Sequence, residues 1–240
     1  MFPRLSGLLH RGGKAAFNPE CAASTRLVTV VGMLGSALLG ALALPVTDIF
    51  TRINPVPGML WGLVAMAPGI VGYGLVYHVS RVLYALGGAR QAVIAASAGW
   101  LTVAAFSWGL GATLPGMFSS RANGILLALG IAQSVGMSVG ALGLLLGLRQ
   151  LAGRQAVSGV GLSALKAAFL ALVSGGAGWF VSGYFMGLWP SVIGTFAAAA
   201  IAGIVSAAIM SPLLIQEFRQ QKRGAAPVAD ASGGEDGETH

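Results

Sequence analysis

The chain has 240 residues, of which 55% are hydrophobic and only 9% charged, and its mean hydropathy is +0.79. A soluble core of this size cannot bury so much apolar surface, so the composition excludes a soluble globular protein and indicates a membrane protein. The net charge of +7 includes no basic cluster interleaved with stacking aromatic residues, which excludes nucleic acid as a partner.

Six apolar stretches follow one another along the chain. Each is long enough to cross a hydrocarbon core of about 30 Å as an α-helix, which takes about 20 residues. The sequence therefore predicts an all-α, polytopic membrane helical bundle with six transmembrane helices. The predicted spans cover about residues 27–47, 60–83, 91–113, 122–148, 164–188 and 192–215.

The two ends of the chain differ from the spans. Residues 1–26 hold leucines and basic side chains suited to a membrane surface, so this part is predicted as a cytoplasmic interfacial segment. From Gly224 onward the composition turns to Ala, Gly, Ser, Pro and acidic residues, and residues 216–240 are predicted as a disordered cytoplasmic tail.

The basic residues predict the orientation of the bundle. With six spans and both ends on one side, only Arg52 and Arg121 fall on the opposite side. Because cytoplasmic loops carry the excess of Lys and Arg, both termini are predicted to be cytoplasmic. Twelve residues share the predicted cytoplasmic side: Arg4, Arg11, Lys14, Arg26, Arg81, Arg90, Arg149, Arg154, Lys166, Arg219, Lys222 and Arg223.

The second span carries a polar and aromatic stripe. Tyr73, Tyr77, Arg81 and Tyr84 recur at helical spacing, so they share one face of a helix that is otherwise apolar. A charge next to hydrocarbon is costly unless it reaches the headgroups or faces an aqueous cavity. We predict these four residues as the substrate-binding set, with a headgroup anchor as the alternative role of Arg81.

One acidic residue lies at the outer end of the first span. Asp48 and Arg52 are four positions apart on the predicted helix, which is the spacing of an intrahelical ion pair. We expect these two side chains to form an interfacial ion pair or to close an outer gate.

The sequence lacks the residue sets of enzyme chemistry. It has one cysteine, three dispersed histidines, no HExxH motif, no paired carboxylates and no Walker-type phosphate loop. Residues 136–140 match G-x-S-x-G, but they lie within a predicted helix, where the strand-to-helix elbow of a hydrolase is absent. We therefore expect no enzymatic activity, no metal and no cofactor.

Glycine is abundant, with 37 residues, and several glycines are spaced four apart within the spans. Such pairs let helix backbones approach closely in a membrane, so we predict that they pack helices against one another. The pairs are Gly136 and Gly140, Gly143 and Gly147, and Gly183 and Gly187.

Several motifs in the first ninety residues resemble one family of membrane transporters. The order of AMAPG at 65–69, Ser80-Arg81, Tyr84-Ala85-Leu86 and Ala89-Arg90 resembles the tenth helix of the MurJ/MviN lipid II flippases. These belong to the multidrug/oligosaccharidyl-lipid/polysaccharide exporter superfamily. The run FPRLS at 2–6 is similar to the segment after the family's eighth helix. The sequence departs from the family pattern at two places. Gly88 replaces the usual Asp, and Gln91-Ala92 replaces Thr-Pro.

The resemblance implies a C-terminal portion or truncated member of the family, covering its helices nine to fourteen. Its members translocate the undecaprenyl-pyrophosphate-linked peptidoglycan precursor across the bacterial inner membrane by alternating access. The cationic cavity residues of the family lie mainly in the helices that this sequence lacks. The resemblance therefore implies membrane lipids and that precursor as partners, and a second chain that supplies the N-terminal lobe.

Two alternatives remain open at the level of sequence. The first is a small six-span carrier of another type that acts as a homo-oligomer. The second is a structural membrane subunit that transports nothing.

Overall fold

The computed structural model describes residues 2–118 and 120–225, and side chains within residues 13–118 and 120–221. Every regular element in these ranges is helical, and none is a strand, which confirms the predicted all-α class. The elements are α1 (Phe2–Ile53), α2 (Met59–Met66), α3 (Gly69–Ala85), α4 (Ala89–Thr113), η1 (Leu114–Met117), α5 (Arg121–Ala152), η2 (Arg154–Val157), α6 (Val160–Leu188) and α7 (Val192–Ala225).

The helices have the length and hydropathy of membrane spans. Five candidate spans of the described chain are long and apolar enough to cross a bilayer, and the bent pair α2 and α3 makes a sixth if it is counted as one span. Large apolar side chains are correspondingly exposed, such as Leu172 at 77% and Ile193 at 82%. The fold therefore indicates a multi-pass membrane protein. Which side each terminus faces stays a prediction.

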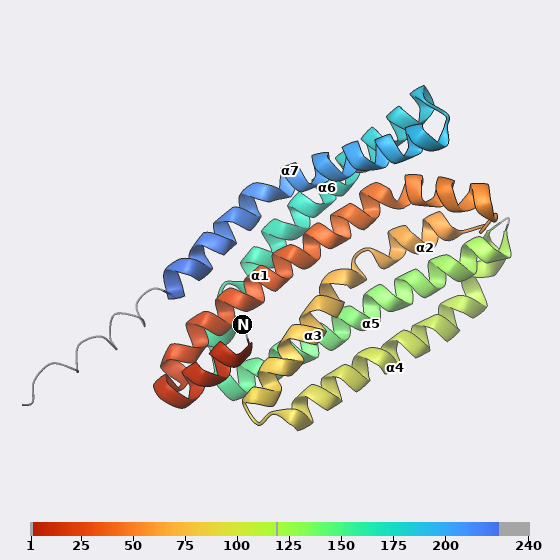
Figure 1. Ribbon diagram of the computed structural model, residues 1–240. Coiled ribbons are helices and arrows are strands. Elements are labelled where there is room, and N and C mark those ends of the chain that lie inside the picture. The colour runs from red at the N-terminus through yellow and green to blue at the C-terminus, as the bar shows by residue number, and fades with distance from the viewer. Residues whose placement is uncertain (1, 119, 226–240) are drawn as a thin grey trace, which may run out of the picture.

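The helices form two groups that share α1 (Figure 1). On one side α1 packs against α6 and α7, and on the other it packs against α2 and α3. Helix α5 contacts α2, α3 and α4 and completes the second group. The start of α1 and the end of α7 lie at the same end of the bundle (Figure 1).

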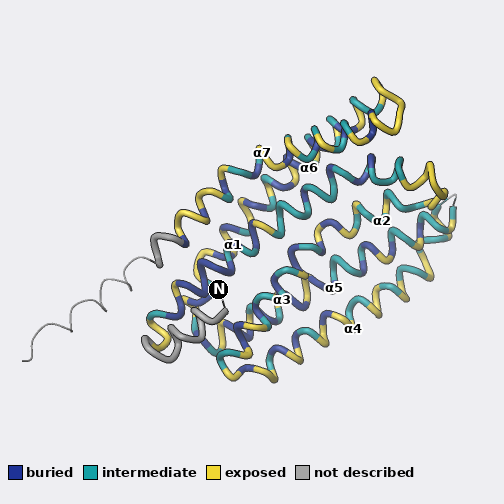
Figure 2. Tube along the Cα trace, in the orientation of Figure 1, coloured by how far each residue is buried: buried dark blue, intermediate teal, exposed yellow. Residues whose placement is uncertain are grey.

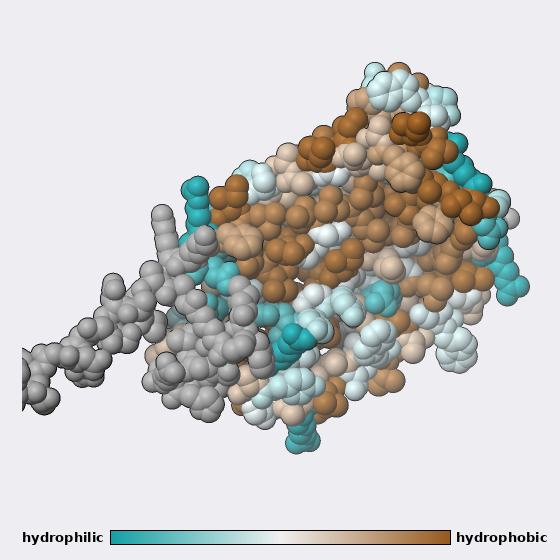
Figure 3. Space-filling model, viewed as in Figure 1, coloured by the Kyte–Doolittle hydropathy of each residue, from teal (hydrophilic) through white to brown (hydrophobic). Residues whose placement is uncertain are grey.

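Burial and hydropathy follow this arrangement. The buried residues lie mainly where helices face one another, and exposed residues follow the outer sides and the far turns (Figure 2). Apolar side chains cover most of the visible face over α1, α6 and α7, whereas the part over α3 and α4 is more mixed (Figure 3). On this face, polar residues are thus more frequent over α3 and α4 than over α1, α6 and α7 (Figure 3).

Helix α1 is longer than the predicted first span. Gly13 has non-helical angles (φ 61°, ψ −162°), and the chain is helical from there to Ile53. The side chains of Lys14 and Asn18 donate hydrogen bonds to the carbonyls of Leu151 and Ala152, at 2.9 and 3.0 Å. Those carbonyls end α5 and have no partner within their own helix. The second half of the predicted interfacial segment is therefore packed onto the bundle.

The predicted second span, residues 60–83, consists of two helices rather than one. Helices α2 and α3 meet at 46°. Pro68 stands at the junction, and its ring removes one backbone donor from the helix. At its other end α3 closes with a Schellman motif, in which Gly88 N–H bonds the carbonyl of Leu83 and Gly87 N–H bonds that of Tyr84, with Gly87 at φ 74°.

The C-terminal boundary also differs from the prediction. Helix α7 continues to Ala225 with Pro212 inside it, so the first part of the predicted disordered tail, residues 216–225, is helical. The reason is packing, because Glu217 and Gln221 are buried, at 5% and 9% exposure. The rest of the predicted tail, residues 226–240, lies outside the described residues.

Candidate functional site

The four predicted substrate-binding residues lie on one exposed face of α3. Tyr73, Tyr77 and Tyr84 are exposed at 57%, 59% and 52%, and Arg81 is exposed as well. The Arg81 guanidinium carbon lies 3.9 Å from the centre of the Tyr77 ring, and one guanidinium nitrogen donates to the Tyr77 hydroxyl. Of the four, Arg81 and Tyr77 are thus in contact as a cation stacked on an aromatic ring, and Tyr73 and Tyr84 lie on the same exposed face. We call them the α3 stripe.

Arg81 differs in its partners from Arg26 and Arg52 of α1. Arg26 pairs with Glu217 at 3.3 Å, and Arg52 pairs with Asp48 at 2.8 Å. No carboxylate of the described chain forms an ion pair with Arg81. Its charge is therefore exposed on a helix with the hydropathy of a membrane span, without a carboxylate partner among the described residues.

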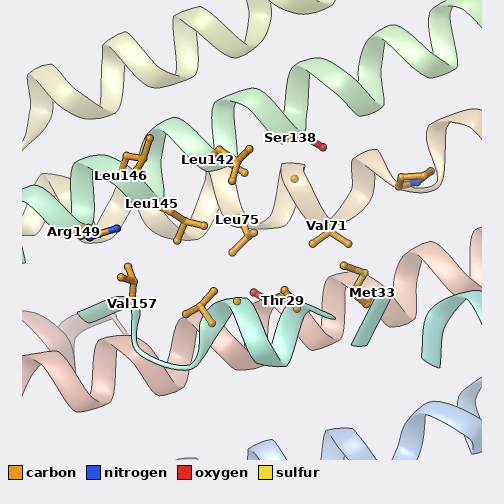
Figure 4. Close-up of a pocket in the computed structure, with 16 residues that line it drawn as sticks. Thr29, Met33, Val71, Leu75, Ser138, Leu142, Leu145, Leu146, Arg149 and Val157 are labelled. Carbon is orange, nitrogen blue, oxygen red and sulfur yellow. The ribbon is translucent and has the colours of Figure 1, made fainter. Parts of the chain in front are cut away.

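The opposite face of α3 lines a groove. Residues along α3 turn by about 100° each, which puts Val71, Gly72 and Leu75 on the side away from the α3 stripe. A cavity of about 560 Å³ lies against these residues, between α5 on one side and α1 and α6 on the other (Figure 4). Helix α3 therefore separates the stripe from this groove.

The groove is apolar along most of its length. Besides α3, its lining comes mainly from α5 and from the start of α6. Arg149 is its one charged lining residue, and it lies at one end, while Ser138 lies toward the other (Figure 4). No ion pair of Arg149 occurs in the part of the chain that the structure describes. The volume is in the range of ligand pockets.

A side chain of α5 enters the break between α2 and α3. The Ser134 hydroxyl accepts a hydrogen bond from the backbone N–H of Gly69 at 3.0 Å and donates to the carbonyl of Ala65 at 2.6 Å. In a continuous α-helix that N–H and that carbonyl bond each other directly. Ser134 therefore occupies the place of a missing helical hydrogen bond.

Two polar clusters tie α1 to α7 near the two ends of the bundle. Asp48, paired with Arg52 as expected from their spacing, also accepts a hydrogen bond from the buried Thr195 hydroxyl at 2.7 Å. At the other end Glu217 joins Arg26 and accepts a hydrogen bond from Ser163 at 2.8 Å. These contacts hold α1, α6 and α7 together, and a gating role of Asp48 and Arg52 stays a prediction.

The predicted glycine pairs fall into two sets. Gly136, Gly140, Gly143 and Gly147 face α4, where an added Cβ at Gly136 would lie 2.7 Å from the carbonyl oxygen of Gly99. The second set, Gly183 and Gly187 on α6, does not pack closely against the backbone of another helix. A Cβ at Gly183 would meet only the Leu44 side chain, at 3.7 Å, and one at Gly187 would meet nothing within 4 Å. Gly187 lies in the last turn of α6, beyond the region where the helix is covered.

Three residues that carry these sites were missed from sequence. Arg149 was predicted only as one of the basic residues of the cytoplasmic side, just beyond the span 122–148, and Ser134 as an ordinary member of that span. Glu217 was placed in the predicted tail. Ser134 and Glu217 act through partners distant in sequence, and Arg149 lines a groove formed by several helices, so pattern alone does not identify these roles.

No group of three or more potential metal ligands occurs among the described residues. No protein-family model, no curated protein and no solved structure matches this chain.

Proposed function

We propose that this chain is the C-terminal portion of a transporter of the lipid II flippase type. It would move the undecaprenyl-pyrophosphate-linked peptidoglycan precursor across the bacterial inner membrane, together with a chain that supplies the N-terminal lobe, and would catalyse no reaction. One observation carries the proposal: the α3 stripe presents, on an exposed face of a membrane helix, an arginine that has no carboxylate partner among the described residues.

The charge of Arg81 is costly next to hydrocarbon. An arginine facing hydrocarbon from within a span is unfavourable by at least about 2.5 kcal/mol, so such residues face a polar cavity, a partner or the headgroups. The three exposed tyrosines add hydroxyl donors and aromatic surface to the same face. A face of this kind suits the lining of a polar cavity that a second body completes.

The chemistry of the stripe suits a pyrophosphate. A guanidinium forms bidentate, charge-assisted hydrogen bonds with phosphate oxygens, and tyrosine hydroxyls donate to the same acceptors. The stacking of Arg81 on Tyr77 holds the guanidinium at a fixed place on the helix. The same face would also serve a small carrier in which a second copy of the chain completes the cavity.

Site-specific photo-crosslinking in cells tests the proposal. A photoreactive residue in place of Tyr73 reports what covers the stripe, and one in place of Leu101, exposed at 70% on α4, serves as the control. We expect adducts with pyrophosphate-linked lipid and with a second polypeptide from position 73 only. Arg81→Ala should reduce the lipid adduct, whereas Arg90→Ala should leave it unchanged.

Other outcomes of the same experiment identify the alternatives. Adducts between two copies of this chain from position 73 would favour the homo-oligomeric carrier. Bulk phospholipid alone at both positions would contradict a substrate cavity on this face and would favour a subunit without transport activity.

A further inference from the structure

The groove opens between two helices that are consecutive in the chain yet are not packed along each other. Helix α5 packs against α2, α3 and α4, whereas α6 packs against α1 and α7, and η2 connects them at one end of the bundle. Helices α1 and α3 line the groove between them (Figure 4). In a bilayer, a space between two spanning helices is open sideways to lipid.

The length of the groove matches one leaflet of a membrane. Its lining on α5 runs from Ser138 to Arg149, eleven positions (149 − 138), which at 1.5 Å per residue is about 16 Å. The hydrocarbon core of a bilayer is about 30 Å thick, so the groove extends over about half of it. An acyl chain of a bilayer lipid has this reach, whereas a long polyprenyl chain exceeds it.

The one charged residue of the lining, Arg149, lies at one end of the groove. Leu142, Leu145 and Leu146 on α5 and Val71 and Leu75 on α3 give the middle of the groove its apolar surface. Arg149 is exposed, and the described chain offers it no carboxylate. A positive charge at the end of an apolar groove of leaflet length is complementary to a lipid with an anionic headgroup.

We propose that this groove is a binding site for an anionic glycerophospholipid, with an acyl chain between α5 and α6 and the phosphate on Arg149. The site lies on the face of α3 away from the stripe, so it is separate from the proposed substrate cavity and does not depend on it.

The selectivity of the groove among lipids depends on the headgroup, because the bilayer is the solvent of the acyl chains. Lipid tails are as apolar as leucine, so moving an acyl chain from the bilayer into the groove gains no hydrophobic free energy. The preference among lipids must therefore come from the headgroup. A charge-assisted hydrogen bond contributes about 1.5–3 kcal/mol, so loss of the guanidinium should weaken anionic lipid binding about tenfold or more.

The test uses the full chain in nanodiscs of mixed phosphatidylglycerol and phosphatidylcholine, with native mass spectrometry of the lipids that remain bound. We expect the wild-type chain to retain phosphatidylglycerol in preference to phosphatidylcholine. In Arg149→Gln, the ratio of bound phosphatidylglycerol to bound phosphatidylcholine should fall about tenfold. Arg149→Lys should retain much of that preference. Arg90→Gln is the matched control, because Arg90 is also exposed and basic but does not line the groove, and it should behave as wild type.

A second variant reports the apolar part of the site. Ala164 lines the groove at the start of α6, and Ala164→Phe fills it with a ring. We expect this variant to lose tightly bound lipid of both classes while keeping its helical circular dichroism. If Arg149→Gln does not fold, Ala164→Phe still tests whether the groove binds lipid.

Two results would overturn the proposal. One is equal retention of phosphatidylglycerol by wild type, Arg149→Gln and Ala164→Phe. The other is displacement of phosphatidylglycerol by added undecaprenyl phosphate, which would make the groove a polyprenyl site. Arg81→Gln should leave phosphatidylglycerol binding unchanged, so failure at the stripe and failure at the groove are distinguishable.

Discussion

The backbone N–H of Gly69 donates a hydrogen bond to the hydroxyl of Ser134 at 3.0 Å, although the two residues lie on different helices. The same hydroxyl donates to the Ala65 carbonyl at 2.6 Å. Polar backbone groups freed by a break in a membrane helix need new partners, and a serine of a neighbouring helix supplies one here. The bend between α2 and α3 is thus stabilised from α5.

Replacement of Ser134 by alanine should change this bend. Without the hydroxyl, the Gly69 N–H and the Ala65 carbonyl either lose their partner, which destabilises the fold by about 1–3 kcal/mol, or bond each other and straighten the helix. Paired spin labels at positions 61 and 84, in a Cys21→Ala background, measure the result. We expect the distance distribution to shift or broaden.

Two control variants accompany Ser134→Ala. Ser134→Thr keeps a hydroxyl and should retain the wild-type distribution. Ser138→Ala removes a hydroxyl one turn away that bonds the carbonyl of Ser134 within its own helix, at 2.7 Å, and should leave the bend unchanged. An unaltered distribution in Ser134→Ala would show that Pro68 and packing alone set the bend.

The pair of Arg26 and Glu217 should contribute to stability because each side chain neutralises the charge of the other. Glu217→Ala leaves the guanidinium, whose side chain is only 18% exposed, without its carboxylate and should lower the free energy of unfolding by about 3 kcal/mol. The double variant Arg26→Met with Glu217→Leu removes both charges, and its free energy of unfolding should fall by less than that of Glu217→Ala. A double-mutant cycle from denaturant unfolding in detergent measures the coupling, and additive losses would contradict it.

The glycines of α5 and α6 should respond differently to alanine. Gly136→Ala places a methyl group 2.7 Å from the Gly99 carbonyl oxygen and should destabilise the bundle by about 1–3 kcal/mol. Gly187→Ala meets open space and should be neutral or stabilising by up to about 1 kcal/mol, because alanine favours the helix. Thermal unfolding in detergent compares the two, and equal effects would argue against close packing of α4 on α5.

The orientation predicted from the basic residues is testable with cysteines in the Cys21→Ala background. Arg121→Cys, at the start of α5, should react with an impermeant maleimide added outside intact cells. Arg154→Cys, in η2 at the other end of α5, should react only after the cells are opened. The reverse pattern would place the termini on the outer side and would change the leaflet in which the groove lies.

Several features of the fold were predictable because they depend on short stretches of sequence. Hydropathy over about 20 residues identified the helices, since crossing a bilayer is a property of one segment. Helical spacing put the α3 stripe residues on one face. The pairing of Asp48 with Arg52 followed from their separation of one turn.

Other features depended on contacts between distant segments. The Arg26–Glu217 pair joins residues 191 positions apart, and it was hidden because residues 216–225 looked like the start of a tail. The break after Ala67 was visible only as a proline, and its stabilisation by Ser134 requires the position of α5. The groove exists because α5 and α6 pack on different partners, which no single segment encodes.

By itself, the sequence determined that the chain forms apolar helices of membrane length, where most of them begin and end, and which residues share a face. Those properties arise from local periodicity and from transfer of each segment out of water. Only the tertiary structure decided that the α3 stripe is exposed, that its far side lines a groove, and that Arg149 lies at the end of that groove. In a membrane, the hydrophobic effect does not choose between helix faces, so packing of small residues and a few polar contacts makes that choice.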